Sequence, residues 1–363
     1  MLYAGCCGLL TDRNGEKMNY KKLLRKAIPS LRTREVILDS IYGDVFRQLK
    51  LIEKRIDQLE EKNEYMFYCL QHDSMENELE TKKRVLASLP KASGRLRGFQ
   101  SVSNYILARM KDICDENHLR FFLTGGTLLG AVRHQGFIPW DDDVDVYMMR
   151  EEFLRFERII GEDKELVVRR CYKYSAFDGG AGYIIKVKLR SSDLFFVDVF
   201  PNDVFSSQLS CEELWKLHEN ISKEFHTELD MILQKHSFSR EWKLPVAYPV
   251  IDQEVKELEE YYRTRFLSLA TSEGPKYICM GIEMEDGLQR RHRISPAEIA
   301  LPINEDEVLF ENKRYHAPND IDRFLTVRYG DYWSLPKSVK PLHSEEFEQI
   351  SEMELSLMTE KML

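Results

Sequence analysis

The sequence lacks an excess of positive charge. It has 52 Lys and Arg residues against 61 Asp and Glu residues, which gives a formal net charge of −9. Proteins that bind nucleic acid without regard to sequence need a basic surface that neutralises phosphates. We therefore expect no nucleic-acid partner.

The sequence also lacks a recognisable cysteine motif. The seven cysteines form no CxxC pair and have no histidine at the spacing of a zinc ligand. A small secreted domain would pair its cysteines in disulfides, and a structural zinc site needs four ligands close together. The pattern predicts reduced thiols in a cytoplasmic protein.

No apolar run approaches the length of a membrane span. A spanning helix needs about 20 apolar residues. Residues 1–10 are apolar, but the run is short and lacks the basic start of a signal peptide. A start at Met18 would make residues 1–17 an extension, and the sequence leaves both starts open. The length suffices for one large domain and an appendage.

Residues 121–147 carry the strongest pattern in the chain. An apolar run of the kind typical of a strand, residues 121–123, leads into Gly125 and Gly126, which permit a tight turn. Thr127 then opens a short apolar stretch with helical character. The exposed N–H groups and positive dipole end of a helix N-terminus bind phosphate, so we predict a phosphate-binding turn here.

Three carboxylates follow this turn. In a strand, Asp141, Asp143 and Asp145 would share one face and Val144 and Val146 the other. Like charges on one face repel each other, and a hard cation such as Mg²⁺ (or Mn²⁺) would resolve the repulsion. The alternative is a solvated acidic turn.

A fourth carboxylate lies downstream. Asp198 is the only polar residue in the apolar run 194–200, which is typical of a strand buried on both faces. A buried carboxylate must be paired or bound to metal. A Gly-Gly turn, an Asp-x-Asp pair and a lone Asp on a neighbouring strand resemble the nucleotidyltransferase fold. We predict an α/β fold with a mixed sheet flanked by helices.

Basic and aromatic residues near these motifs are candidates for substrate binding. Arg133 and His134 lie between the turn and the acids, where an Arg suits bidentate phosphate recognition, or else lie on the surface. Trp140 would stack on a base or be buried as a structural residue. Lys186, Lys188 and Arg190 alternate on a strand, where they would neutralise a diphosphate or face solvent at an edge.

The N-terminal part predicts two helices. Residues 17–34 combine a basic and an apolar face, which favours contact with an anionic membrane or packing on a protein surface. Residues 38–70 carry apolar residues at alternating intervals of four and three over roughly five heptads, with Asn63 at a core position. This is typical of a dimeric coiled coil; a helix folded back on its own domain is the alternative.

We predict four regions from these patterns. They are an extension with a basic helix over residues 1–37, a coiled coil with a linker over 38–92, a catalytic domain over 93–345, and a C-terminal helix over 346–363. Within the catalytic domain, the charged helical region 207–270 is expected to receive the acceptor.

Three segments resemble, in order, blocks of the LicD family of phosphotransferases, which includes bacterial phosphorylcholine transferases and is related to fukutin and fukutin-related protein. They are GGTLLGAVRHQGFIPWDDDVDV, FFVDVFPND and YGDYWSLP. The last block contains Tyr329 and Asp331, which would contact substrate or close the fold. The family also has a basic residue near Lys186. The resemblance covers about residues 95–340 and leaves residues 1–90 uncovered.

The resemblance implies an enzyme that transfers a phospho-alcohol group, first of all phosphorylcholine, from a CDP-activated donor to a glycan or lipid-linked glycan with release of CMP. It implies that Asp143, Asp145 and Asp198 are catalytic and hold Mg²⁺ with Asp141. The acceptor would belong to a cell-surface polysaccharide, and the enzyme would be cytoplasmic with peripheral membrane contact. Other CDP-alcohols, a nucleotide sugar, and an inactive coiled-coil scaffold are the alternatives.

Overall fold

The computed structural model describes residues 52, 71, 75–174, 181–239, 245–271, 274–284 and 293–335. The predicted basic helix 17–34, nearly all of the predicted coiled coil 38–70, and the C-terminal helix 346–363 lie outside these residues. The chain divides into two compact units, Met1–Glu78 and Leu79–Leu363. The elements below belong to the second unit, apart from the first residue of helix α3, Glu78–Ala87.

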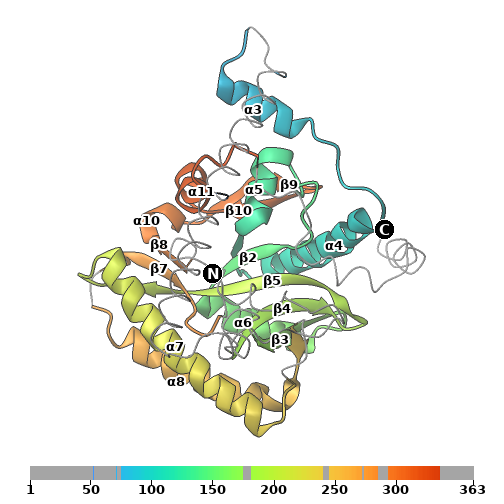
Figure 1. The fold of residues 1–363 in the computed structure, drawn as a ribbon. Helices are drawn as coiled ribbons and strands as arrows, with labels where there is room; N and C mark the ends of the chain where they lie inside the picture. Colours follow the sequence, from blue (N-terminus) through green and yellow to red (C-terminus); the bar gives the residue numbers. More distant parts are fainter. Residues whose placement is uncertain are drawn as a thin grey trace, which may run out of the picture. The chain divides into compact units, whose positions relative to one another are not determined.

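A mixed sheet forms the centre of this unit (Figure 1). Its strand order is β1-β2-β5-β4-β3-β6, with β7 on β5 and β8 on β7. The strands are β1 Phe121–Leu123, β2 Asp145–Met149, β3 Leu166–Tyr174, β4 Ala181–Leu189, β5 Ser192–Phe205, β6 Val246–Ala247, β7 Tyr277–Met280 and β8 Ile294–Pro296. The β2–β5 pair is parallel and the other pairs are antiparallel. The prediction of a mixed sheet flanked by helices is confirmed.

The long strand β5 organises the sheet. Asp198 and Val199 pair with β2 on one edge and β4 on the other, while Asn202 pairs with β2 and β7. The strands β4 and β7 therefore share one edge of β5, and β2 has the opposite edge. The continuous apolar run of β5 follows from this central position, because a strand covered on both faces has no solvated side.

Helices cover this sheet and extend beyond it (Figure 1). They are α4 Gly94–Glu116, α5 Gly125–His134, α6 Arg150–Glu162, α7 Cys211–Lys235, α8 Asp252–Leu267, α10 Ala297–Ala300 and α11 Ile321–Tyr329, with a 3₁₀ turn at Pro249–Ile251. The apolar face of α4, from Phe99 to Ile113, is buried, and the ring of Phe99 lies 5.1 Å from the ring of Phe195 in β5. Helix α11 ends at Gly330, which has a positive φ of 69°.

A hairpin of β9 Asn304–Phe310 and β10 Lys313–Ala317 forms a two-stranded sheet that is separate from the main one. The strand predicted across residues 141–146 begins only at Asp145. Residues 141–144 precede it without strand pairing to β1, whose register covers Val146 to Met148.

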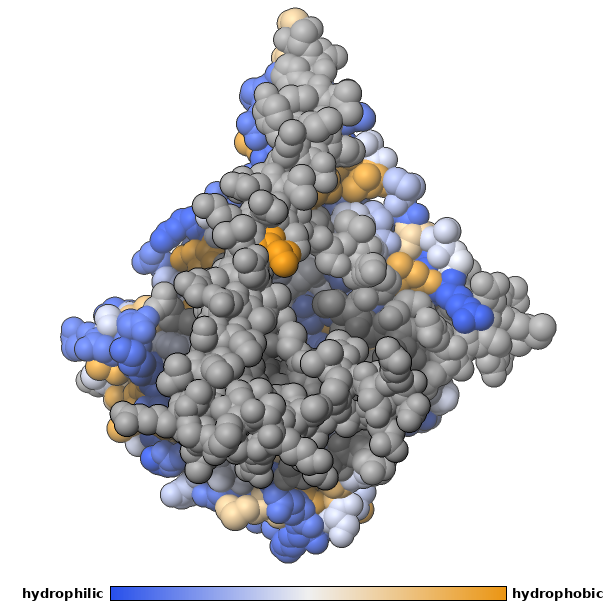
Figure 2. Space-filling model, viewed as in Figure 1, coloured by the Kyte–Doolittle hydropathy of each residue, from blue (hydrophilic) through white to orange (hydrophobic). Residues whose placement is uncertain are grey.

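The described surface is mainly hydrophilic in the view of Figure 2, with small hydrophobic patches between polar ones. Large exposed apolar side chains include Met231, Val250 and Tyr261. Among the described helices, none is long and apolar enough to cross a membrane.

A buried ionic cluster joins α6, β5, α8 and the segment after β7. Arg150 donates hydrogen bonds to Asp203, Glu259 and Glu283, the last at 2.6 Å. A side chain at Gly281 would meet the Arg150 guanidinium at 2.3 Å, so the glycine leaves room for this arginine. Burial raises the pKa of Glu283 to about 7; Arg150 opposes this shift, whereas Glu259 and Asp203 increase it.

Ionisation of Glu283 should lower the free energy of unfolding as pH rises. Its folded pKa of about 7 lies above its ordinary value of 4.5, so the folded chain binds the proton more tightly than the unfolded chain. The stabilising contribution is complete below the unfolded pKa and is lost as pH rises through the folded one. The variant Glu283→Gln should therefore gain stability relative to the wild type from roughly pH 5 to 8 in denaturant titrations.

The exposed Glu257→Gln is the matched control, and its stability difference from the wild type should not change with pH in this way. A pH-independent difference between Glu283→Gln and the wild type would contradict the assignment.

Candidate active site at the β2–β5 pair

The parallel pairing of β2 with β5 sets Asp145 directly opposite Asp198. The Asp198 N–H donates to the carbonyl of Val144 at 2.7 Å, which fixes the register. Paired residues on adjacent strands present their side chains on the same face of a sheet. The structure thus brings together two carboxylates that are separated by more than 50 positions in the sequence, as the expected neighbouring strands require.

The other two acids lie in the segment just before β2. Burial alternates along this segment: Asp142 and Val144 are buried, whereas Asp141, Asp143 and Asp145 are half-buried. The predicted division into two faces therefore holds, although only Asp145 belongs to the strand. Burial of Asp142 is a feature that the sequence alternation did not address.

The glycine turn lies against these acids. Gly125, the first residue of α5, has a positive φ of 55°, and a Cβ atom there would lie 2.2 Å from Asp145 Oδ2. A Cβ atom at Gly126 would lie 2.5 Å from Asp141 Oδ2. Two glycines are thus required for the carboxylates to approach the helix N-terminus, whose dipole favours negative charge.

Thr127 ties the same helix to β2. Its hydroxyl accepts a hydrogen bond of 2.8 Å from the Asp145 N–H, and the Thr124 N–H donates to the Asp145 carbonyl. The first turn of α5 therefore holds both backbone polar groups of Asp145. This fixes the residue that the strand register places beside Asp198.

Charge repulsion dominates the electrostatics of these acids. Burial raises the pKa of Asp145 well above its usual range, and the charges of Asp143, Asp198 and Asp141 raise it further, against the effect of Lys186. Burial likewise raises the pKa of Asp141, with added repulsion from Asp143 and Asp142. The ionised form of the cluster therefore lacks enough positive charge nearby.

A hard divalent cation suits this set of donors, since it takes oxygen ligands and would offset the repulsion. Among the described residues, however, no three His, Cys, Asp or Glu side chains are already gathered at a common point for an ion. Rotation of the carboxylates toward one another would be needed to hold one. The donor atoms and their location therefore suit a divalent cation, although the carboxylates do not yet converge on one point.

The ammonium group of Lys186 lies beside the Asp198 carboxylate. Lys186 is buried on β4, opposite Asp198, with Nζ 2.9 Å from Asp198 Oδ1 and 3.1 Å from the centre of the Phe196 ring. The contact is an ion pair without hydrogen-bond geometry, because Asp198 Oδ1 has no hydrogen-bond partner among the described residues. The predicted phosphate contact of Lys186 stays a prediction.

The two other cations of this strand region are engaged elsewhere. Lys188 donates to the carbonyl of Asp193, and Arg190 donates to carbonyls at the end of α6, including that of Gly161. The expected face of three cations is therefore reduced to Lys186 at this site.

Arg133 and His134 belong to the last turn of α5 rather than to a loop, since α5 extends further than the sequence indicated. Arg133 is buried and donates to the carbonyl of Ser334. Burial and the neighbouring Arg133 lower the pKa of His134 to about 4, against the effect of a hydrogen bond with the Leu86 backbone. Trp140 is half-buried and packs against the hydrophobic core.

Tyr329 and Asp331, the two predicted residues of the C-terminal block, lie in different surroundings. Tyr329 is 37% exposed, yet burial of its phenol raises its pKa, as do the charges of Asp145, Asp141 and Asp143. Its hydroxyl end therefore lies near the acids. Asp331 instead accepts hydrogen bonds from Lys82 Nζ at 2.8 Å and from the Trp333 N–H at 3.1 Å.

Two buried polar residues that the sequence did not single out hold the acidic segment and the loop before it. Gln100 on α4 donates to the Asp141 carbonyl at 2.8 Å. Glu311, in the β9–β10 turn, accepts from Arg97 at 2.8 Å and lies against Gly136, where a Cβ atom would be 2.6 Å from its carboxylate. In the sequence, Gln100 is noticeable only as a polar residue within an apolar helical face. Nothing in the sequence marks Glu311.

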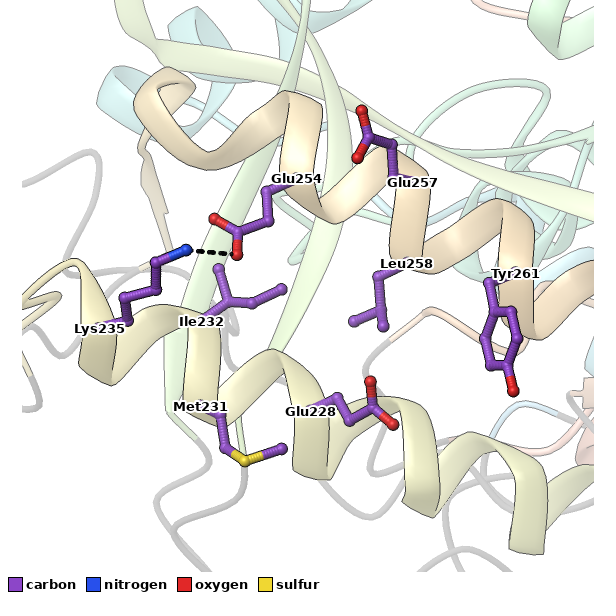
Figure 3. Close-up of a pocket in the computed structure, with 8 residues that line it drawn as sticks. All are labelled: Glu228, Met231, Ile232, Lys235, Glu254, Glu257, Leu258 and Tyr261. Atoms are coloured by element: carbon purple, nitrogen blue, oxygen red, sulfur yellow. Dashed lines mark hydrogen bonds and ion pairs between the residues drawn. The ribbon is translucent and has the colours of Figure 1, made fainter.

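A separate groove of about 590 Å³ lies between α7 and α8 (Figure 3). Its floor is apolar, with Ile232 and Leu258, and its rim includes Lys235 and Glu254, which pair at 2.8 Å. None of its lining residues is one of the predicted site residues. The expectation that this helical region receives the acceptor stays a prediction.

Comparison with known proteins gives matches that include this site. The family model described as "LicD/FKTN/FKRP, nucleotidyltransferase domain" matches residues 118–247, a range that holds the glycine turn, all four acids and Lys186. Tyr329 and Asp331 lie outside it.

Individual relatives match over different lengths. The lipopolysaccharide cholinephosphotransferase LicD of Haemophilus influenzae is 27% identical over 271 residues, which cover 69% of this chain and 97% of that protein. The uncharacterized protein RT0683 of Rickettsia typhi is 37% identical over 26% of this chain and 33% of its own length. The human ribitol 5-phosphate transferase FKRP is 31% identical over 29% of this chain and 20% of its own length.

The family prediction made from the three sequence blocks is confirmed by these matches. Over residues 118–247 the chain carries a LicD/FKTN/FKRP nucleotidyltransferase domain, and it is distantly related to the LicD transferases of substituted phosphate groups.

Proposed function

We propose that this protein transfers phosphorylcholine from CDP-choline to a hydroxyl group of a cell-surface glycan precursor and releases CMP. The observation that carries the proposal is the register of Asp145 opposite Asp198, with crowded carboxylates against a glycine turn. The choice of group is supported by the match that extends over 97% of a cholinephosphotransferase.

A second donor class has its own support. The human relative is named a ribitol 5-phosphate transferase, and its match covers 108 residues at 31% identity. CDP-ribitol, and CDP-glycerol with it, is therefore the alternative donor. A nucleotide sugar, giving transfer of a sugar phosphate, is a further possible result of a donor screen.

Asp143, Asp145 and Asp198 would hold Mg²⁺ (or Mn²⁺), with Asp141 beside them. When bound, the ion neutralises the diphosphate and its leaving group. The N-terminal turn of α5, with Gly125, offers backbone N–H groups to a phosphate. This positioning holds the phosphorus in line with the attacking oxygen.

Among the chain's own residues, Asp198 is the candidate for accepting the proton of the attacking hydroxyl. The acceptor oxygen forms the new P–O bond, the P–O bond to CMP breaks, and the hydroxyl proton must be removed. Asp198 either takes this proton or holds a second cation, in which case the proton goes to solvent water. The ion pair with Lys186, at 2.9 Å, orients the Asp198 carboxylate in both cases.

We further propose that the acceptor is lipid-linked and meets the enzyme at the cytoplasmic face of the membrane. The support is in the sequence: the basic and apolar faces of residues 17–34 suit an anionic membrane surface. The heptads of residues 38–70 favour a homodimer.

A thermal-shift screen tests the donor without knowledge of the acceptor. CDP-choline with Mg²⁺ should raise the melting temperature by roughly 3–5 °C at about 100 times its Kd, since a ligand of the folded state stabilises it by mass action. A shift with CDP-ribitol or a UDP- or GDP-sugar instead would change the donor. The absence of any shift would favour the inactive scaffold.

The variant Asp145→Asn should lose the Mg²⁺-dependent shift without loss of unliganded stability. Removal of one crowded carboxylate relieves repulsion, so its unliganded melting temperature should equal or exceed that of the wild type. The exposed Asp193→Asn serves as control and should keep the full shift. A normal Mg²⁺-dependent shift in Asp145→Asn would remove this residue from the site.

The variant Gly125→Ala should lower both stability and donor binding. The added Cβ would meet Asp145 Oδ2 at 2.2 Å in a backbone conformation with φ 55°, so we expect a loss of about 1–3 kcal/mol in unfolding free energy. Gly161→Ala in α6 is the control, because no atom lies within 4 Å of its Cβ position. That change should be neutral or slightly stabilising.

A further inference from the structure

Helix α3 is tied to the segment that follows α11. Lys82 Nζ lies 2.8 Å from Asp331 Oδ2 and donates to Ser334 Oγ at 3.4 Å. The next residue, Lys83, stacks its ammonium 5.0 Å from the centre of the Trp333 ring. These contacts join residues that are about 250 positions apart in the chain, and they lie outside the range that the family model matches.

The same segment is fastened to the far end of α5. Asp331 accepts from Ser334 Oγ at 2.7 Å, and the carbonyl of Ser334 accepts a hydrogen bond from Arg133. Arg133 belongs to the last turn of α5, whose first turn holds Gly125 against Asp145. A ten-residue helix is about 15 Å long and moves as a rigid body, so contacts at its end constrain its beginning.

Burial of two members distinguishes this set of contacts from a fully exposed ion pair. Lys82 is only 9% exposed, and lysines are rarely so well covered unless they are paired. Arg133 is likewise buried, at 5% exposed. The Asp331 side chain is 55% exposed, but it also accepts hydrogen bonds from Ser334 Oγ and from the Trp333 N–H, which define its orientation. We call the linked contacts of Lys82, Asp331, Ser334 and Arg133 the latch.

We propose that Lys82 is a positioning residue for the acidic site: through Asp331 and Ser334 it fixes Arg133, and with it helix α5 and the glycine turn. Asp331 then acts in this latch rather than on substrate. The catalytic consequence rests on the proposed function, whereas the structural link to α5 does not.

Hydrogen–deuterium exchange of the full-length protein without substrate tests the link. In Lys82→Ala, amides of residues 124–135 and 329–335 should exchange about five- to tenfold faster, because the latch limits local opening. Amides of α7 should be unchanged. Lys82→Arg, which keeps the charge, should restore slow exchange, and Lys82→Met, which keeps the buried stem, replaces the alanine variant if that fails to fold.

A control variant and a double variant test whether the effect is specific to the Lys82–Asp331 contact. Lys223→Ala removes an exposed lysine paired with Glu219 at 3.1 Å on α7, and it should leave exchange in α5 as in the wild type. Lys82→Ala combined with Asp331→Ala should exchange no faster in α5 than either single variant, since both remove the same link. Faster exchange confined to α3, with α5 unchanged, would overturn the proposal.

Donor titration by thermal shift provides the functional readout. With CDP-choline and Mg²⁺, Lys82→Ala should bind the donor about three- to tenfold more weakly, and Lys82→Arg should recover the affinity. Unchanged donor affinity together with faster exchange in α5 would overturn the positioning role. If the wild type binds no CDP-linked donor, the proposed function fails, and the exchange experiment still tests the latch.

Discussion

The parallel pairing of β2 with β5 is the interaction on which the site depends. It places Asp145 opposite Asp198 and, because β4 pairs with the other edge of β5, Lys186 beside Asp198 as well. Two carboxylates and one lysine thus share one region of the sheet. Such a grouping is costly to bury, so the surrounding elements must hold it in place.

Several elements hold it by short polar contacts. The first turn of α5 binds the backbone of Asp145 through Thr127, and Gln100 of α4 binds the backbone of Asp141. The glycines of α5 allow the carboxylates to approach within a distance that any side chain would block. These constraints keep like charges close together, and a bound cation would offset their repulsion.

The sequence predicted the parts of this arrangement that depend on local pattern. The turn at Gly125 and the apolar run around Asp198 each follow from the spacing of residues along one element. It did not predict Gln100, Glu311 or Lys82, because their partners are 41, 214 and 249 positions away and leave no periodic signal. The predicted start of strand β2 was also wrong, because the side chains already alternate in burial before strand pairing begins at Asp145.

Titration with Mn²⁺, monitored by electron paramagnetic resonance, tests whether the four acids hold a divalent cation. Bound Mn²⁺ loses the signal of the free ion, and we expect saturable binding to the wild type. That binding should be competed by Mg²⁺ and lost in Asp145→Asn, but kept in Asp193→Asn. Equal binding by the wild type and Asp145→Asn, or none by the wild type, would show that these acids do not form a metal site.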